Sequence, residues 1–165
     1  MRPPGWSGLE RERNPKTWET RRQEKQGTRR WDLFTQEADF KPDGGRQERA
    51  LRLIIEQPGV GRIYCAREGG RVVGMVSLLF TISTAEGGRA AWLEDMIVHP
   101  SHRGRGIGDR LLDHAIREAK DFGCSRITLL TDSTNTSAMR FYARAGFARS
   151  QMVPFRLRQR TGKHR

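Results

Sequence analysis

Residues 103–108, Arg-Gly-Arg-Gly-Ile-Gly, place three glycines and two arginines in six consecutive positions of this chain. Because glycine has no Cβ, successive backbone N–H groups can turn toward one point and surround an anion. Arg103 and Arg105 add positive charge at the rim. A helix that begins directly after the loop would favour the same anion through its first amides and its dipole. The stretch therefore indicates a site for a phosphorylated ligand, with pyrophosphate the best-fitting group, and a plain surface turn is the alternative.

Three phosphate-binding patterns can be compared with this loop. The P-loop needs a lysine and a serine or threonine after its last glycine, but Asp109 and Arg110 follow Gly108. The dinucleotide fingerprint G-x-G-x-x-G needs a glycine where Asp109 stands. The third pattern, R/Q-x-x-G-x-G/A between a strand and a helix, is matched in full by residues 103–108. The spacing therefore excludes the first two patterns and leaves the third.

Hydrophobic periodicity predicts the elements that would position this loop. The predicted order is helix, helix, three strands, helix, strand, helix and strand, over residues 31–40, 50–55, 62–68, 71–82, 90–98, 107–122, 125–130, 138–145 and 152–157. The three consecutive strands form an antiparallel meander, because short glycine-containing loops join them. The strand–helix–strand that follows is a crossover. We therefore predict an α/β layered domain with a mixed sheet.

The charge of the chain lies at its ends. Of the net charge of +12, residues 1–30 and residues 156–165 each contribute +5, so the centre is close to neutral. We predict three parts: a basic, disordered extension over 1–30, a domain over 31–157, and a basic tail over 158–165. A nucleic-acid partner is not expected as the principal role, because the basic residues do not gather on the folded part.

Several other classes of protein are not expected either. The chain has no apolar run near the ~20 residues that span a membrane, and its first residues lack the apolar core of a secretory signal. Cys65 and Cys124 lie far apart and are expected to be reduced thiols of a cytoplasmic protein. No metal site is expected, because His99 and His102 have no third convergent ligand and fit a loop.

A second pattern lies downstream of the loop, in the last predicted helix. Six residues follow the spacing N-x-x-A-x-x-F-Y-x-x-x-G-F, namely Asn135, Ala138, Phe141, Tyr142, Gly146 and Phe147. Seven residues make nearly two helical turns, so Asn135 and Tyr142 project from one face. Alone, they would be a capping asparagine and a half-buried aromatic residue. Together with the glycine loop, they make residues 31–157 resemble the GNAT superfamily of acetyl-CoA-dependent N-acetyltransferases.

The resemblance implies a GNAT-like mixed central sheet flanked by helices. Family members usually begin with a strand before the first helix, and residues 1–30 contain no convincing candidate for it. Either the sheet lacks this first strand, or the segment Thr28–Trp31 supplies a short one.

The resemblance also implies an activity, the direct transfer of an acetyl group from acetyl-CoA to a primary amine in a ternary complex. A small-molecule acceptor is favoured over a protein, and a homodimer is left open. The alternative is a non-catalytic acyl-CoA-binding sensor or scaffold of the same fold. The residues that would bind acetyl-CoA are the backbone of Met96, Ile97 and Val98 for the pantetheine arm, the loop of Arg103, Gly104, Arg105, Gly106, Ile107, Gly108 and Asp109 for the pyrophosphate, and Asn135.

Two residues would move the protons. Tyr142 is the expected general acid, because a phenol with a pKa of about 10 can protonate a thiolate whose conjugate acid has a pKa of about 8.5. Glu94 is the expected general base, acting directly or through water, although a structural carboxylate at a strand edge would look the same. Adjacent strand residues point to opposite faces, so Asp95 is expected to face away while Glu94 shares its face with Met96 and Val98.

Overall fold

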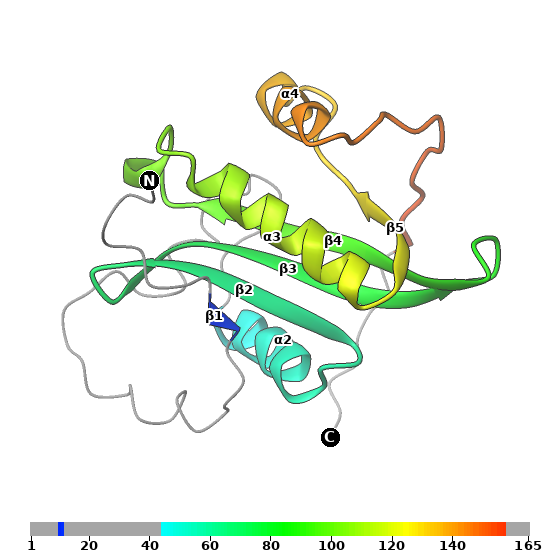
Figure 1. The fold of residues 1–165 in the computed structure, drawn as a ribbon, viewed down its shortest axis with the longest axis horizontal. Coiled ribbons are helices and arrows are strands. Elements are labelled where there is room, and N and C mark those ends of the chain that lie inside the picture. Colours follow the sequence, from blue (N-terminus) through cyan, green and yellow to red (C-terminus); the bar gives the residue numbers. More distant parts are fainter. Residues whose placement is uncertain (1–9, 12–43, 158–165) are drawn as a thin grey trace. The chain divides into compact units, whose positions relative to one another are not determined.

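The computed structural model describes residues 10–11 and 44–157 (Figure 1). The chain divides into two compact units, Met1–Asp132 and Ser133–Arg165.

The first unit contains a five-stranded sheet in the order β1-β2-β3-β4-β5. The pairs β1–β2, β2–β3 and β3–β4 are antiparallel, and β5 runs parallel to β4. The strand bounds are β1 (Glu10–Arg11), β2 (Gly61–Glu68), β3 (Arg71–Ser83), β4 (Gly88–Val98) and β5 (Cys124–Leu129). The meander and the crossover through helix α3 (Ile107–Asp121) confirm the predicted mixed α/β sheet.

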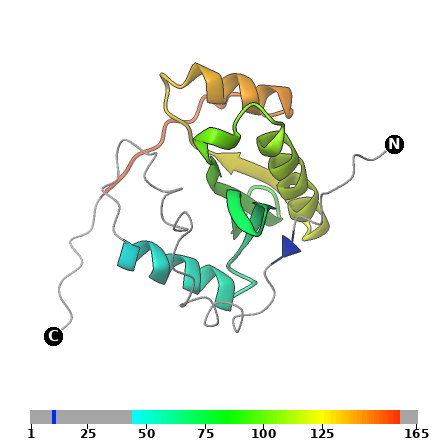
Figure 2. The same cartoon turned by 90° about the vertical axis from the view of Figure 1, so that its left-hand side faces the viewer.

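Helix α2 (Gly44–Glu56) and helix α3 cover opposite faces of the sheet (Figure 2). On the α2 face, Leu51 packs with Cys65, Met75 and Ile97 in one buried cluster. Helix α3 buries an apolar stripe, as its spacing predicts, formed by Ile107, Leu111, Leu112, Ala115 and Ala119. Both helices therefore form where the periodicity places them, and α3 begins directly after the glycine loop.

A polar contact fixes the second half of α3 on strand β2. The fully buried Tyr64 donates its hydroxyl to Glu118 Oε2 at 3.0 Å, and Arg62 Nη1 lies 3.3 Å from the same oxygen. Burial raises the pKa of Tyr64 to about 12, so the phenol keeps its proton and remains a donor. This contact holds the second half of α3 on the sheet together with the apolar stripe of the helix.

The N-terminal edge of the sheet differs from expectation. Strand β1 pairs Glu10 with Cys65 and Arg11 with Tyr64, within a segment where the sequence offers no strand candidate. The proposed alternative, Thr28–Trp31, and the helix predicted over 31–40 lie outside the described residues. A two-residue strand carries no detectable alternation, which is why periodicity does not find it.

The second unit contains helix α4 (Thr136–Arg144), as predicted. Asn135 caps it, because its side-chain oxygen accepts the Ala138 N–H at 3.0 Å. The strand predicted over 152–157 is not formed, and that prediction is wrong. Pro154 lacks a backbone donor and interrupts any ladder at the middle of the segment.

The two cysteines and the lengths of the helices bear on two further expectations. Both cysteines are free thiols, with Cys65 buried and Cys124 partly exposed. Within the described residues, no helix is long and apolar enough to cross a membrane.

Gly74 lets α3 approach the sheet closely, because it has no Cβ. A Cβ at this position would lie 3.0 Å from Leu111 Cδ1 and 3.1 Å from the Ile97 carbonyl oxygen. We expect Gly74→Val to lower the free energy of unfolding by about 1–3 kcal/mol, the usual cost of overpacking, as measured by urea denaturation. Gly88→Ala is the control, because its Cβ would meet nothing within 4 Å. Equal stability of the two variants would contradict this packing.

Candidate functional site

The loop between β4 and α3 has the backbone that its glycines predict. A short 3-10 helix, Pro100–His102, leads into Arg103, which is extended. Gly104 and Gly106 both have φ of 71°, in the left-handed region that favours glycine. Gly106 is also the N-cap of α3 and makes no side-chain capping bond. The first-turn amides of α3 therefore lack intrahelical acceptors and lie beside a loop with room for an anion.

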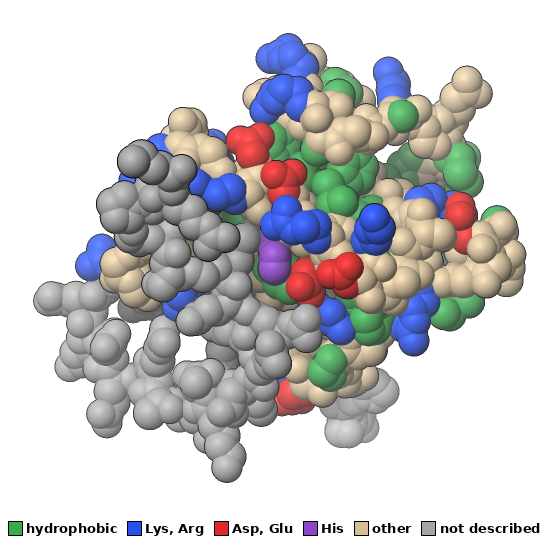
Figure 3. Space-filling model, in the orientation of Figure 1, with side chains coloured by type: hydrophobic (Ala, Val, Ile, Leu, Met, Phe, Trp, Pro, Cys, Tyr) green, Lys and Arg blue, Asp and Glu red, His purple; other side chains and the backbone are tan. Residues whose placement is uncertain are grey.

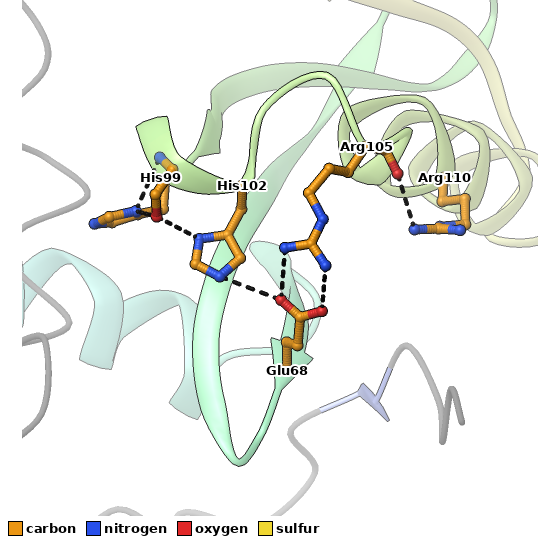
Figure 4. Close-up of polar contacts among 6 residues, drawn as sticks. Glu68, His99, His102, Arg105 and Arg110 are labelled. Carbon is orange, nitrogen blue, oxygen red and sulfur yellow. Dashed lines mark hydrogen bonds and ion pairs between the residues drawn. The ribbon is translucent and has the colours of Figure 1, made fainter. Parts of the chain in front are cut away.

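Each arginine of the loop is held by a hydrogen bond or an ion pair. Arg103 Nε donates to the Val98 carbonyl oxygen at 3.1 Å, which ties the loop to the end of β4. Arg105 makes two bonds to Glu68 at the end of β2, at 2.7 and 3.0 Å (Figure 4). The Arg105 carbonyl oxygen accepts from Arg110 Nη2 at 3.4 Å. Arg105 is thus paired with a carboxylate rather than presenting an uncompensated charge at the rim.

Strand β4 has an open edge just before this loop. Its parallel pairing with β5 ends at Leu93 and Leu129, although β4 continues to Val98. On the other side, the Asp95 N–H donates to Ser77 Oγ and the His99 N–H donates to the Val73 carbonyl oxygen. By strand alternation, the main-chain groups of Met96 and Val98 face away from β3. This edge can therefore pair with an extended ligand.

A β-bulge lies where the open edge begins. Leu93 pairs with Leu78 and Met96 pairs with Val76, so Glu94 and Asp95 together oppose the single residue Ser77. Leu93 and Met96 consequently share one face, and both carboxylates lie on the other. The prediction that Glu94 shares a face with Met96 and Val98 is therefore wrong. It fails because the extra residue reverses the alternation on which it rests.

Ser77 holds this bulge through both of its hydrogen-bonding capacities. Its side chain is fully buried. Its hydroxyl accepts the Asp95 N–H at 3.1 Å and donates to Asp95 Oδ2 at 2.8 Å. Burial raises the pKa of Asp95 above its ordinary value, against the lowering effect of the Ser77 hydrogen bond. Glu94, by contrast, is exposed.

Asn135 and Tyr142 belong to the second unit. The Tyr142 ring packs edge-on against Phe141 and Phe147, with centroids 5.1 and 5.8 Å away. Burial raises the pKa of Tyr142 above 10.0, so its phenol is protonated at neutral pH. Asn135 Oδ1 is used by the helix cap, which leaves its amide nitrogen to donate to a ligand.

Comparison with known proteins decides the family. Residues 15–147 match the family model described as the acetyltransferase (GNAT) family. The chain belongs to this family. The GNAT assignment agrees with the mixed sheet, the open β4 edge and the loop that begins α3.

This GNAT chain is similar to curated acetyltransferases. It is 36% identical over 89 residues to glucosamine 6-phosphate N-acetyltransferase of Trypanosoma brucei brucei, covering 53% of this chain and 58% of that protein. It is 41% identical over 134 residues to streptothricin acetyltransferase of Streptomyces lavendulae, covering 70% and 71%. The chain spans about half the length of the first curated relatives it matches.

A solved structure is similar to this chain over most of its length. The structure of a transcriptional regulator from Bacillus halodurans C-125 is 31% identical and superimposes with a TM-score of 0.64. The superposition covers 76% of this chain and 83% of that one. The GNAT arrangement is therefore shared well beyond the segment that carries the glycine loop.

Sequence reasoning missed two residues of this site. The first is Asp95, which strand alternation predicts on the face opposite Glu94. One signal for it is its partner Ser77, a lone polar residue inside the apolar run of β3. Glu68 carries no local signal, because its partner Arg105 is 37 positions away. Among residues 10–11 and 44–157, no group of three or more His, Cys, Asp or Glu could hold a metal ion.

Asp95 should make the stability of this GNAT domain depend on pH. Its pKa is raised in the fold above the ordinary value of 3.8, so the native state binds the proton more tightly than the unfolded chain. The free energy of unfolding should therefore fall as the pH rises from 3.8 through the raised pKa of Asp95, and it should stay lower above that pKa. Asp95→Asn, which keeps an oxygen to accept from Ser77, should have a higher Tm than the unmodified chain at pH 8. No such gain is expected at pH 3.

The measurement is thermal unfolding followed by circular dichroism at both pH values. Asp113→Asn is the control, because Asp113 is an exposed carboxylate on α3 and reports the effect of removing one surface charge. A lower Tm for Asp95→Asn at pH 8 would show that ionised Asp95 stabilises the fold instead.

Proposed function

We propose that this chain is an acetyl-CoA-dependent N-acetyltransferase that acetylates the primary amine of a small molecule by direct attack. The observation that carries the proposal is a juxtaposition within the first unit. The open main-chain edge at Met96 and Val98 leads directly into the glycine loop at the start of α3. Such an arrangement suits a ligand that has an amide-containing arm at one end and a pyrophosphate at the other.

The loop fits the pyrophosphate of acetyl-CoA. Cβ atoms built at Gly104 and Gly106 meet nothing within 4 Å, so the space next to these residues is open. The backbone amides from Gly104 to Asp109 and the positive end of the α3 dipole would hold the phosphates there. Arg103 contributes positive charge to the same loop, whereas the charge of Arg105 is compensated by Glu68.

The strand fits the pantetheine arm. The outward main-chain groups of Met96 and the Val98 N–H would bond its amides as an added strand does, while the Val98 carbonyl oxygen already accepts from Arg103 Nε. The Asn135 amide would bond the arm as well. A main-chain N–H of this strand would polarise the thioester carbonyl. Acetyl-CoA supplies the acetyl group as a thioester.

The reaction forms a C–N bond, breaks the C–S bond, removes one proton from the amine and adds one to the thiolate. Tyr142 would supply the proton to the thiolate, since burial raises its pKa and keeps the phenol protonated. Glu94 would accept the amine proton directly or through water. The bulge places Asp95 on the face of Glu94, so it is the second candidate for this role.

Several relatives are named for the small molecule that they acetylate, which supports a small-molecule acceptor for this chain. Besides the trypanosomal and Streptomyces proteins, they include thialysine N-epsilon-acetyltransferase of Bos taurus and aminoalkylphosphonate N-acetyltransferase of Salmonella typhimurium. Charge gives no support for a nucleic-acid role of the described part. Over α3, the face in Figure 3 carries basic and acidic side chains side by side rather than one basic band.

Thiol release from acetyl-CoA over a panel of primary amines tests the activity. We expect turnover with at least one small amine, and we expect Tyr142→Phe to lower kcat by roughly 10²-fold or more, because it removes the proton donor. The variant should bind CoA as the unmodified chain does. Binding of CoA without turnover on any amine would contradict the enzyme and favour the sensor or scaffold of the same fold.

Gly106→Glu tests the cofactor site. The new carboxylate would occupy the proposed pyrophosphate position and repel it, so we expect CoA binding by isothermal titration calorimetry to weaken by at least about 100-fold. The control is Gly87→Glu, which places the same residue at φ of 66° in the β3–β4 hairpin, also with nothing within 4 Å. The control removes the effects of strain and added charge from the comparison. Unchanged affinity in Gly106→Glu would show that the loop does not bind the pyrophosphate.

A further inference from the structure

We propose that Glu68, at the end of β2, is a positioning residue that fixes the shape of the cofactor-binding loop through Arg105. The proposal rests on the function proposed above, since it concerns the same loop. Glu68 lies on the β2–β3 hairpin and outside the glycine pattern.

The carboxylate of Glu68 bridges two parts of the segment that follows β4. It receives Arg105 Nη2 at 2.7 Å on one oxygen and Arg105 Nη1 at 3.0 Å on the other. His102 Nε2 lies 3.2 Å from the second oxygen, and its Nδ1 lies 2.8 Å from Ser101 Oγ (Figure 4). One side chain therefore connects the hairpin both to the 3-10 helix and to the middle of the loop.

Side-chain packing does not replace this connection. Between the hairpin and the 3-10 helix lies a hollow of about 530 Å³, lined by Glu68, Gly69, Arg71, Val72, Val73, His99, Ser101 and His102. One backbone hydrogen bond, from the His99 N–H to the Val73 carbonyl oxygen, joins the two sides where the 3-10 helix begins. Glu68 adds side-chain contacts to His102, which also lines the hollow, and to Arg105.

The consequence for the loop follows from peptide geometry. Arg105 lies between Gly104 and Gly106, which both have left-handed backbone conformations. Because glycines are conformationally free, contacts made by Arg105 can fix the shape of the loop. Glu68 holds its side chain and Arg110 holds its carbonyl oxygen. In a trans peptide the next N–H points opposite to that carbonyl, so the direction of the Gly106 N–H is fixed too. This amide belongs to the group that would bind pyrophosphate.

The size of the effect follows from populations. If the binding-competent loop conformation is nearly always present with Glu68, and is present about a tenth to a third of the time without it, affinity falls by about 3- to 10-fold. The loss concerns binding of the cofactor and not the chemical step. An opposite effect is expected if Glu68 merely competes with phosphate for Arg105, because its removal would then strengthen binding.

The experiment measures the Kd of CoA by calorimetry and the KM and kcat for acetyl-CoA in Glu68→Ala and Glu68→Gln. We expect Kd and KM to rise about 3- to 10-fold in Glu68→Ala, by less in Glu68→Gln, and kcat to change less than 2-fold. In an Arg105→Gln background, Glu68→Ala should add nothing, because Glu68 acts through Arg105.

The matched control is Glu86→Ala. Glu86 lies in the turn between β3 and β4 and pairs with Arg126 of β5 at 3.2 Å. Its side-chain exposure of 33% is close to the 35% of Glu68, but the pair does not touch the loop. The CoA affinity of this variant should stay within 2-fold of the unmodified chain. A comparable loss in the control would overturn the proposal, since it would trace the effect to general charge.

Other outcomes overturn it as clearly. They are an unchanged or lower Kd in both Glu68 variants, a fall in kcat at unchanged Kd, or a further loss in the Arg105→Gln background. Glu68→Gln keeps the test valid if Glu68→Ala does not fold. Failure of the unmodified chain to bind CoA removes the proposed function together with this inference. Loss of binding in Gly106→Glu but not in the Glu68 variants removes this inference alone.

Discussion

Strand β4 parts from β5 after Leu93, and the β-bulge at Glu94 and Asp95 lies at that point. The bulge reverses the alternation of the strand. The main-chain groups of Met96 and Val98 point away from β3, on the side where β5 no longer pairs with β4. The Val98 carbonyl oxygen accepts from Arg103 Nε, and the other outward groups need water or a ligand because they have no ladder partner. The candidate site exists because the sheet leaves this stretch of one internal strand open on one side.

The bulge is itself maintained from within the sheet. Ser77 is fully buried, and a buried hydroxyl must be satisfied. It bonds both the backbone and the carboxylate of Asp95, which compensates for burying part of an ionisable group. The strand that shapes the site is thus fixed by a residue of the neighbouring strand.

The helix side of the site depends on the same sheet. Tyr64 and Arg62 hold Glu118 near the far end of α3, and Gly74 lets Leu111 approach β3 closely. Because a helix is stiff, these contacts decide where its first turn lies. The left-handed Gly106 then turns the chain from the loop into that first turn. Glu68 adds a contact to the loop from a third element, the β2–β3 hairpin.

The sequence by itself determined the elements from α2 to α4, their order, the glycine loop and the family, because periodicity and glycine spacing are local properties. The apolar residues within 152–157 predict a strand that is not formed, because Pro154 interrupts the segment. The sequence also placed Glu94 on the face of Met96, because alternation assumes a regular register. Only the tertiary structure decided the bulge opposite Ser77 and the pairing of Glu68 with Arg105. Both depend on which residues of distant segments meet, and no local pattern encodes that register.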